Sequence, residues 1–126
     1  MKKTILLTGA TGFLGSYLLD ALLLKGFKVI ILKRTTSNLW RIEHLLSKVT
    51  SYDVDVQPLE LAFSEQNIDY VIHTACHYGR NGDSISKIAE TNLIFSLRIL
   101  DASIKFNTVT FFNTDTLLSK HLNFYT

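Results

Sequence analysis

Residues 8–15 read Thr-Gly-Ala-Thr-Gly-Phe-Leu-Gly, and this stretch decides how the rest of the chain is interpreted. The apolar run Ile5-Leu6-Leu7 precedes it, and an amphipathic run over residues 13–25 follows it. A strand, a glycine-rich turn and a helix in this order form a cradle for a nucleotide phosphate, because backbone N–H groups and the positive end of the helix face the ligand. The stretch therefore predicts a strand–turn–helix unit that binds a dinucleotide.

Each glycine of the stretch has a separate expected task. Gly9 allows a sharp turn after the strand, Gly12 lets the backbone approach a pyrophosphate, and Gly15 lets the helix pack closely on the sheet. An ordinary turn without a ligand is the alternative interpretation of the same residues. The predicted phosphate-binding residues are Gly9, Thr11, Gly12, Phe13, Leu14 and Gly15.

Strand and helix patterns continue to alternate beyond this unit, which is typical of a parallel sheet covered by helices. Strands are predicted at residues 4–7, 27–32, 49–56, 68–74 and 108–113, and helices at 13–25, 38–48, 58–66 and 84–105. Helical spacing predicts the following apolar faces for three of these helices: Phe13, Leu14, Tyr17, Leu18, Ala21 and Leu22; Leu39, Ile42, Leu45 and Leu46; and Ile85, Ile88, Ala89, Asn92, Phe95, Ile99 and Leu100.

The composition is that of one globular domain over residues 1–126, with 47% hydrophobic and 19% charged residues. A net charge of +2 without a basic stripe argues against a nucleic-acid partner. No apolar run approaches the roughly 18 residues that a membrane span needs. The only cysteine, Cys76, indicates a reducing, cytoplasmic setting. No metal site is expected.

The end of the second predicted strand is where a dinucleotide-binding domain selects its cofactor, about 20 positions beyond the glycines. An acidic residue there binds the ribose 2′-hydroxyl of NAD, but this chain has Lys33-Arg34. A guanidinium at Arg34 can meet a 2′-phosphate through two hydrogen bonds. The sequence therefore favours NADP over NAD, with a pair of solvated cations as the alternative interpretation.

The Gly-x-x-Gly-x-x-Gly spacing of TGATGFLG resembles the extended short-chain dehydrogenase/reductase family, which contains nucleotide-sugar epimerases, dehydratases and reductases. The resemblance implies a Rossmann-like, doubly wound parallel sheet of about five strands in the order 3-2-1-4-5 with flanking helices. It covers the whole chain but only the N-terminal part of a family member. The smaller substrate-binding region is expected to lie outside these residues.

Three further segments resemble family motifs. Val71 to Ala75 looks like the strand whose end passes the cofactor, which implies cofactor contacts for Thr74 and Ala75. His73 in that strand is interpreted as a packed, hydrogen-bonded side chain rather than a catalytic one. An acidic residue followed by an aliphatic one after the third strand implies an adenine contact, and Asp53 is preferred over Asp55. Asn92 is similar to an Asn that supports the active site through a backbone contact, or it is a locally satisfied polar residue.

The resemblance also implies where the chemistry takes place. Thr114, after the fifth strand, matches the hydroxyl that binds the oxygen of the sugar carbon. Thr116 stands where the dehydratases have Glu after Thr-Asp, which favours epimerase or ketoreductase chemistry. Tyr125 is placed as the proton-transferring tyrosine, but the lysine of Tyr-x-x-x-Lys falls three residues beyond Thr126. The 126-residue chain alone is therefore expected to be inactive.

The sequence thus predicts the cofactor-binding half of an enzyme that transfers hydride between a nicotinamide and the carbon of a nucleotide sugar. A non-catalytic NADP-binding sensor or regulatory protein is the alternative. The resemblance also implies that the full-length parent protein can form a homodimer. Sugar identity lies beyond what these residues predict.

Overall fold

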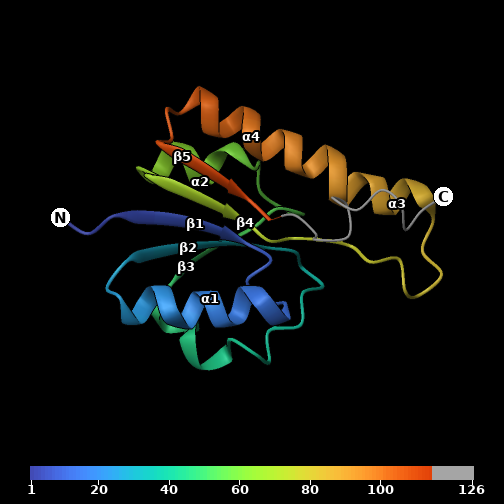
Figure 1. Ribbon diagram of the computed structural model, residues 1–126, viewed down its shortest axis with the longest axis horizontal. Coiled ribbons are helices and arrows are strands. Elements are labelled where there is room, and N and C mark those ends of the chain that lie inside the picture. Colours follow the sequence, from blue (N-terminus) through green and yellow to red (C-terminus); the bar gives the residue numbers. More distant parts are fainter. Residues whose placement is uncertain (115–126) are drawn as a thin grey trace, which may run out of the picture.

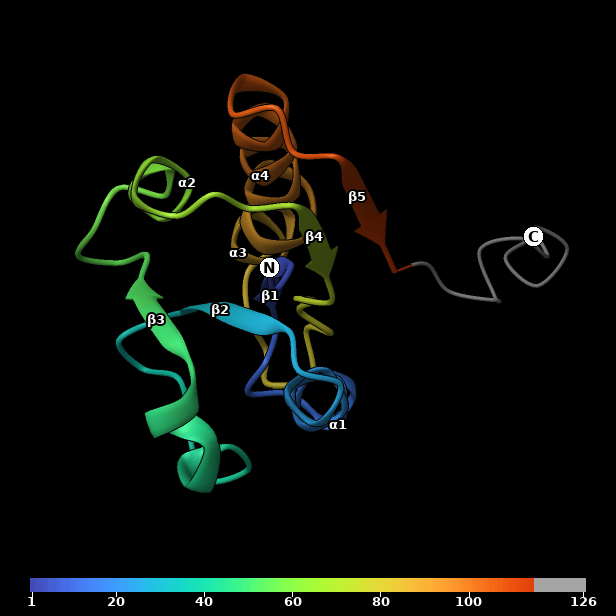
Figure 2. The ribbon, with the colours of Figure 1, turned by 90° about the vertical axis from the view of Figure 1, so that its left-hand side faces the viewer.

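The computed structural model of the protein describes residues 1–114. Its five strands form one parallel sheet in the order β3-β2-β1-β4-β5, which confirms the predicted order. The strands are β1 (Thr4–Thr8), β2 (Lys28–Lys33), β3 (Thr50–Asp53), β4 (Tyr70–His73) and β5 (Thr110–Asn113). Figure 2 shows β3 and β5 at opposite edges of the sheet.

Helices cover both faces of the sheet (Figure 1). One face is covered by α1 (Phe13–Leu24) and the 3₁₀ helix η1 (Glu43–Lys48). The other is covered by α2 (Glu60–Glu65) and by one long helix in three parts: α3 (Ile85–Ala89), the π-helical segment η2 (Glu90–Ile94) and α4 (Phe95–Lys105). This two-sided cover follows from parallel strands, whose return connections must cross over the faces of the sheet.

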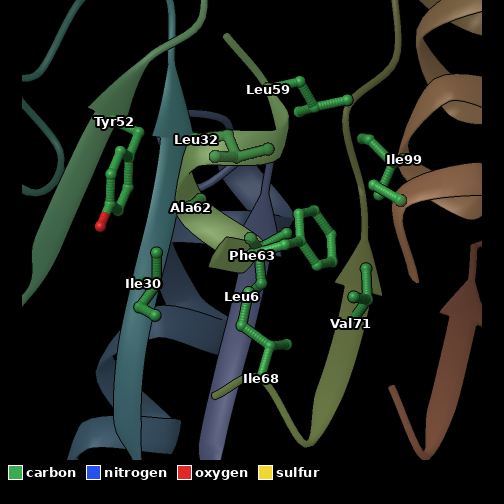
Figure 3. Packing of buried hydrophobic residues seen from close by; sticks show 11 residues of the cluster. Leu6, Ile30, Leu32, Tyr52, Leu59, Ala62, Phe63, Ile68, Val71 and Ile99 are labelled. Atoms are coloured by element: carbon green, nitrogen blue, oxygen red, sulfur yellow. The ribbon is translucent and has the colours of Figure 1, made fainter. Parts of the chain in front are cut away.

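Two apolar cores lie on the two faces of the sheet, because successive strand residues point in opposite directions. Leu6 belongs to the core under α2 and α4, whereas Leu7 belongs to the core under α1 and η1. Figure 3 shows the first core, where Phe63 of α2 and Ile99 of α4 pack with Leu6 and other residues of the strands. All five residues of β1 are buried, as expected for a central parallel strand.

The strand register brings the carboxyl ends of all five strands to one edge. Thr8 of β1 pairs with Leu32 and His73, Leu32 pairs with Tyr52, and His73 pairs with Asn113. Residues that follow these positions therefore lie along the same rim of the sheet. This rim is where open α/β sheets bind ligands, on either side of the point where the strand order reverses.

The predicted apolar face of α1 is wrong in its first turns. The residues buried in α1 are Gly15, Ser16 and Leu19, whereas Phe13 and Tyr17 are 72% and 68% exposed. The reason is the close approach of Gly15 to the turn before the helix, which sets the rotation of α1 about its axis. The bulky residues on either side of Gly15 therefore point away from the sheet.

Two other predicted helices differ from the structure. Residues 38–48 form turns followed by the short helix η1, although Ile42 and Leu45 are buried as expected and Trp40 is exposed. In the helix predicted over 84–105, the π-helical segment adds a residue to one turn and shifts the buried face. Ile99 stays in the core, but Ile85 is 86% exposed. Within the described part of the chain, no helix is long and apolar enough to cross a membrane.

Candidate dinucleotide-binding site

The turn after β1 has the geometry that its glycines predict. Gly9 has φ +69°, in the left-handed region, and its carbonyl oxygen accepts a hydrogen bond from Gly12 N at 3.0 Å. A Cβ on Gly9 would lie 2.5 Å from Thr74 Oγ1 and 2.7 Å from Ala75 N. The turn thus lies directly against the end of β4, so that two segments predicted to contact the cofactor are neighbours.

Gly15 fixes how α1 lies on that turn. A Cβ on Gly15 would overlap the carbonyl oxygen of Gly9 and come within 2.6 Å of its carbonyl carbon. Both contacts are with backbone, which cannot rotate away as a side chain can. The absence of a side chain at this position is therefore what allows the first turn of α1 to follow the glycine turn so closely.

The N-terminus of α1 is open to an anion. Gly12 is the N-cap, no side chain caps the helix, and no acidic residue lies in its first turn. The first N–H groups of an α-helix have no partner within the helix, and the helix dipole places positive charge there. Gly12, Phe13 and Leu14 are exposed and Thr11 is half-buried, so a pyrophosphate has access to this backbone. These residues fit the phosphates of a dinucleotide.

A buried hydrogen-bond network supports the turn from beneath. Thr8 Oγ1 lies 2.7 Å from His73 Nδ1, and His73 Nε2 lies 2.8 Å from Ser96 Oγ. Ser96 donates its only hydroxyl proton to the carbonyl oxygen of Asn92, so it accepts from His73 Nε2. Nε2 of His73 therefore carries a proton. Thr8 Oγ1 already accepts from Thr74 N and Ala75 N, so it donates to Nδ1, and the ring is neutral with its proton on Nε2. This confirms that His73 is a packed, hydrogen-bonded side chain.

The same network reaches the backbone at the end of β4. Thr74 N and Ala75 N each donate to Thr8 Oγ1 at 3.2 Å, and Thr74 Oγ1 donates to Thr8 O at 2.7 Å. Thr8 thus accepts from two backbone groups while it donates to His73. The roles of Thr8 and Ser96 were not predicted from the sequence. For Thr8 the available signal was a polar residue directly after the apolar run Ile5-Leu6-Leu7.

Burial of the imidazole lowers the pKa of His73 below its ordinary value of 6.5. The unfolded chain therefore takes up a proton near pH 6.5 that the folded chain excludes, so the free energy of unfolding decreases as the pH falls from 7.5 through 6.5. Urea unfolding at pH 7.5, 6.5 and 5.5 measures this dependence. In His73→Asn the decrease over this range is expected to be smaller. An equal decrease in both proteins would contradict the assignment.

Asn92 contacts backbone, as the resemblance implies. Its side chain accepts from His77 N at 2.7 Å and donates to His77 O at 2.8 Å. The His77 ring accepts from Gly79 N and lies 3.3 Å from Asp83 Oδ2. The loop that follows β4 is therefore fastened to the long helix next to the rim of the sheet.

The predicted cofactor-selecting residues lie together at the ends of β2 and β3. Lys33 Nζ lies 3.1 Å from Asp53 Oδ2, and Arg34 Nε lies 3.1 Å from Asp55 Oδ1. Burial alone would raise the pKa of Asp53, but hydrogen bonds from Thr35, from Asp55 N and from Lys33 outweigh it and lower the pKa. Arg34 thus pairs with an acidic residue of the neighbouring strand end, while 58% of its side chain stays exposed to solvent.

Of the two residues predicted to act on the substrate, the structure describes only Thr114. Thr114 follows β5 on the same rim, where its Oγ1 donates to His73 O at 3.0 Å. Tyr125 lies outside the described residues. No group of three His, Cys, Asp or Glu side chains in residues 1–114 is placed to hold a metal ion.

Comparisons with known proteins find relatives that match almost the whole of this chain. CDP-abequose synthase of Salmonella muenchen is 32% identical over 125 residues, which cover 99% of this chain and 41% of that protein. The Bordetella bronchiseptica enzyme WbmG in complex with NAD has a TM-score of 0.80 and 25% identity, covering 94% of this chain and 39% of that one. UDP-glucose 4-epimerase from Bifidobacterium longum in complex with NAD⁺ and UDP has a TM-score of 0.74 and 32% identity. The match covers 91% of this chain and 37% of that one.

The chain therefore spans between 37% and 41% of the length of these three proteins. A family model described as the NAD dependent epimerase/dehydratase family matches residues 5–122. This match covers nearly the whole chain. The chain belongs to the NAD dependent epimerase/dehydratase family.

Proposed function

We propose that this chain is the cofactor-binding half of an NAD(P)-dependent enzyme that modifies a nucleotide sugar as an epimerase, dehydratase or reductase. The observation that supports this most directly is the uncapped N-terminus of α1 behind the glycine turn. The names of the relatives, a CDP-abequose synthase and a UDP-glucose 4-epimerase, agree with a nucleotide-sugar substrate. Residues 1–126 act as one incomplete domain in this proposal.

The backbone of the glycine turn would hold the pyrophosphate, with Thr11, Phe13 and Leu14 presenting their N–H groups. Gly12, whose own N–H is bonded to Gly9 O, would leave room for the phosphates because it has no side chain. Thr74 and Ala75 would border the ribose and nicotinamide, because they lie against Gly9.

Asp53 would contact the adenine. A carboxylate has about four acceptor positions, of which Asp53 uses three, for Lys33, Thr35 and Asp55 N. One position therefore stays open for an adenine amino group.

The reaction would take place at the carboxyl end of β5. When bound, the nicotinamide supplies the hydride acceptor or donor for the sugar carbon. Thr114 would hold the oxygen of that carbon: its hydroxyl proton is directed to His73 O, which leaves its lone pairs to accept from a sugar hydroxyl. Tyr125 would move the hydroxyl proton.

Three finer statements remain part of the proposal. NADP is preferred because of Arg34, although the solved relatives named above contain NAD. A homodimer of the full-length protein is suggested by the exposed apolar residues of the long helix, which include Leu93, Leu97 and Ile104. A cytoplasmic location is suggested by the single cysteine.

Gly12→Ala tests the proposed pyrophosphate contact. A methyl group here is expected to weaken the binding of ADP-ribose to the chain at least tenfold, because it occupies the surface that the phosphates approach. The variant is expected to lose only about 1 kcal/mol of stability, the usual difference at an N-cap. Isothermal titration calorimetry measures the affinity, and urea unfolding measures the stability.

Gly26→Ala is the matched control for this experiment. Gly26 has φ +83° and lies at the other end of α1 with no atom near its Cβ position, so alanine strains the backbone there without touching the glycine turn. ADP-ribose should bind this variant as tightly as wild type. If wild type does not bind ADP-ribose, or if both variants lose the same affinity, the proposed pyrophosphate site is wrong.

A further inference from the structure

The ends of β2 and β3 hold a cluster of four charged side chains, Lys33, Arg34, Asp53 and Asp55, which we call the rim cluster. The register places Lys33 opposite Asp53, and their side chains form a half-buried ion pair. Arg34 and Asp55 form a second, more exposed pair, with 58% and 31% of their side chains accessible. Two cations and two anions of the rim cluster therefore balance one another.

Asp55 binds Arg34 along only one edge of the guanidinium. Arg34 Nε donates to Asp55 Oδ1 at 3.1 Å and more weakly to Oδ2 at 3.4 Å. The two terminal nitrogens of Arg34 carry four N–H groups. Within residues 1–114 these groups donate no hydrogen bond, because only Nε is bonded to Asp55. The two terminal nitrogens, which can bind a phosphate through parallel hydrogen bonds, are therefore still available while Asp55 holds the side chain in place.

Asp55 also fixes the backbone from which Arg34 extends. Its Oδ2 accepts from Thr35 N at 3.0 Å. On the other side of the same loop, Arg34 N donates to Ser37 Oγ at 2.9 Å, and Ser37 N donates to Arg34 O at 3.0 Å. One carboxylate thus holds both the main chain and the side chain of the Arg34 loop. Asp53 accepts from Lys33, Thr35 and Asp55 N and has no hydrogen bond to Arg34 in the described residues.

We propose that Asp55 is a positioning residue that orients Arg34 toward a 2′-phosphate on the adenosine ribose, and so determines the preference for NADP. The inference rests on the proposed function, because it assigns the cofactor of the same site. Two effects of Asp55 oppose each other: its negative charge repels a phosphate, while its bond to Nε holds a long side chain in the binding geometry. In this proposal the orientation of Arg34 affects the affinity for the 2′-phosphate more than the repulsion by Asp55 does.

The two effects predict opposite results for Asp55→Ala. We would titrate the chain with 2′-phospho-ADP-ribose and with ADP-ribose, which lack the nicotinamide and differ by the phosphate alone. Wild type is expected to bind the 2′-phosphorylated compound at least tenfold more tightly, and Arg34→Ala is expected to abolish this preference. Asp55→Ala should lose most of the preference with ADP-ribose affinity unchanged, which also shows that the variant is folded.

Asp55→Asn provides the rescue. Its amide oxygen can accept from Arg34 Nε while the charge is gone, but the amide NH2 group that then faces Thr35 N cannot accept from it. Asp55→Asn should therefore keep more of the preference for the 2′-phosphate than Asp55→Ala does. Unchanged or tighter binding of 2′-phospho-ADP-ribose by Asp55→Ala would overturn the proposal, as would a wild type that binds both compounds equally. Each of these results leaves ADP-ribose binding intact, whereas failure of the proposed function removes it from wild type.

Discussion

Replacing Gly15 with alanine is expected to lower the free energy of unfolding by about 3 kcal/mol or more, the upper end of what overpacking of a well-packed interior costs. The new methyl group overlaps the carbonyl oxygen of Gly9 and lies 2.9 Å from Ala10 Cα. Gly9 cannot retreat, because its own Cα lies against Thr74 and Ala75. Either α1 moves off the sheet or the glycine turn opens. Urea unfolding followed by circular dichroism measures the loss.

Gly26→Ala is also the control for the stability of Gly15→Ala, because both variants add a methyl group to a glycine. The left-handed conformation of Gly26 costs an alanine about 1–2 kcal/mol, and no steric overlap is added. Gly15 does not have a positive φ, so its loss arises from overlap alone. Equal losses for the two variants would show that α1 adjusts to a side chain at position 15, contrary to the geometry described for the turn.

Thr8→Val is the second substitution with a large expected effect. Valine has nearly the shape of threonine but lacks the hydroxyl, so Thr74 N, Ala75 N and His73 Nδ1 all lose a partner. A buried polar group left unpaired costs about 1–3 kcal/mol, and a total loss of about 3 kcal/mol is expected because part of the region can reach water. Thermal or urea unfolding at pH 7.5 measures it.

Thr108→Val makes the same chemical change where the hydroxyl has no partner. Thr108 Oγ1 is buried without a hydrogen bond to any described residue. Removing it is expected to leave the stability within about 0.5 kcal/mol of wild type or to increase it, since nothing is left unsatisfied. If Thr8→Val is as mild as Thr108→Val, the buried network does not stabilise the fold in the way its hydrogen bonds indicate.

The tasks of Gly9 and Gly15 could be predicted because they depend on local sequence, whereas the sheet order was predicted from the resemblance to the family. Glycine spacing specifies the turn, and apolar runs of strand length between helical patterns specify a parallel sheet. The tasks of the two glycines therefore need no knowledge of which distant residues meet.

Features that depend on distant contacts were predicted less well. The exposure of Phe13 and Tyr17 follows from the contact of Gly15 with Gly9, which helical periodicity does not include. The bond between Arg34 and Asp55 joins residues 21 positions apart, and only the register of β2 and β3 brings them together. The π-helical segment likewise has no signature in the apolar pattern.

That π-helical segment has a consequence for how the protein can change during evolution. Asn92 lies within it and holds the loop at His77, while Ile99, further along the same helix, packs in the core. Deleting one residue between them would turn one contact relative to the other by about 100°, so both could not be kept in a regular helix. The extra residue thus sets the rotation between the loop contact and the core contact, and the long helix can make both only while that residue is retained.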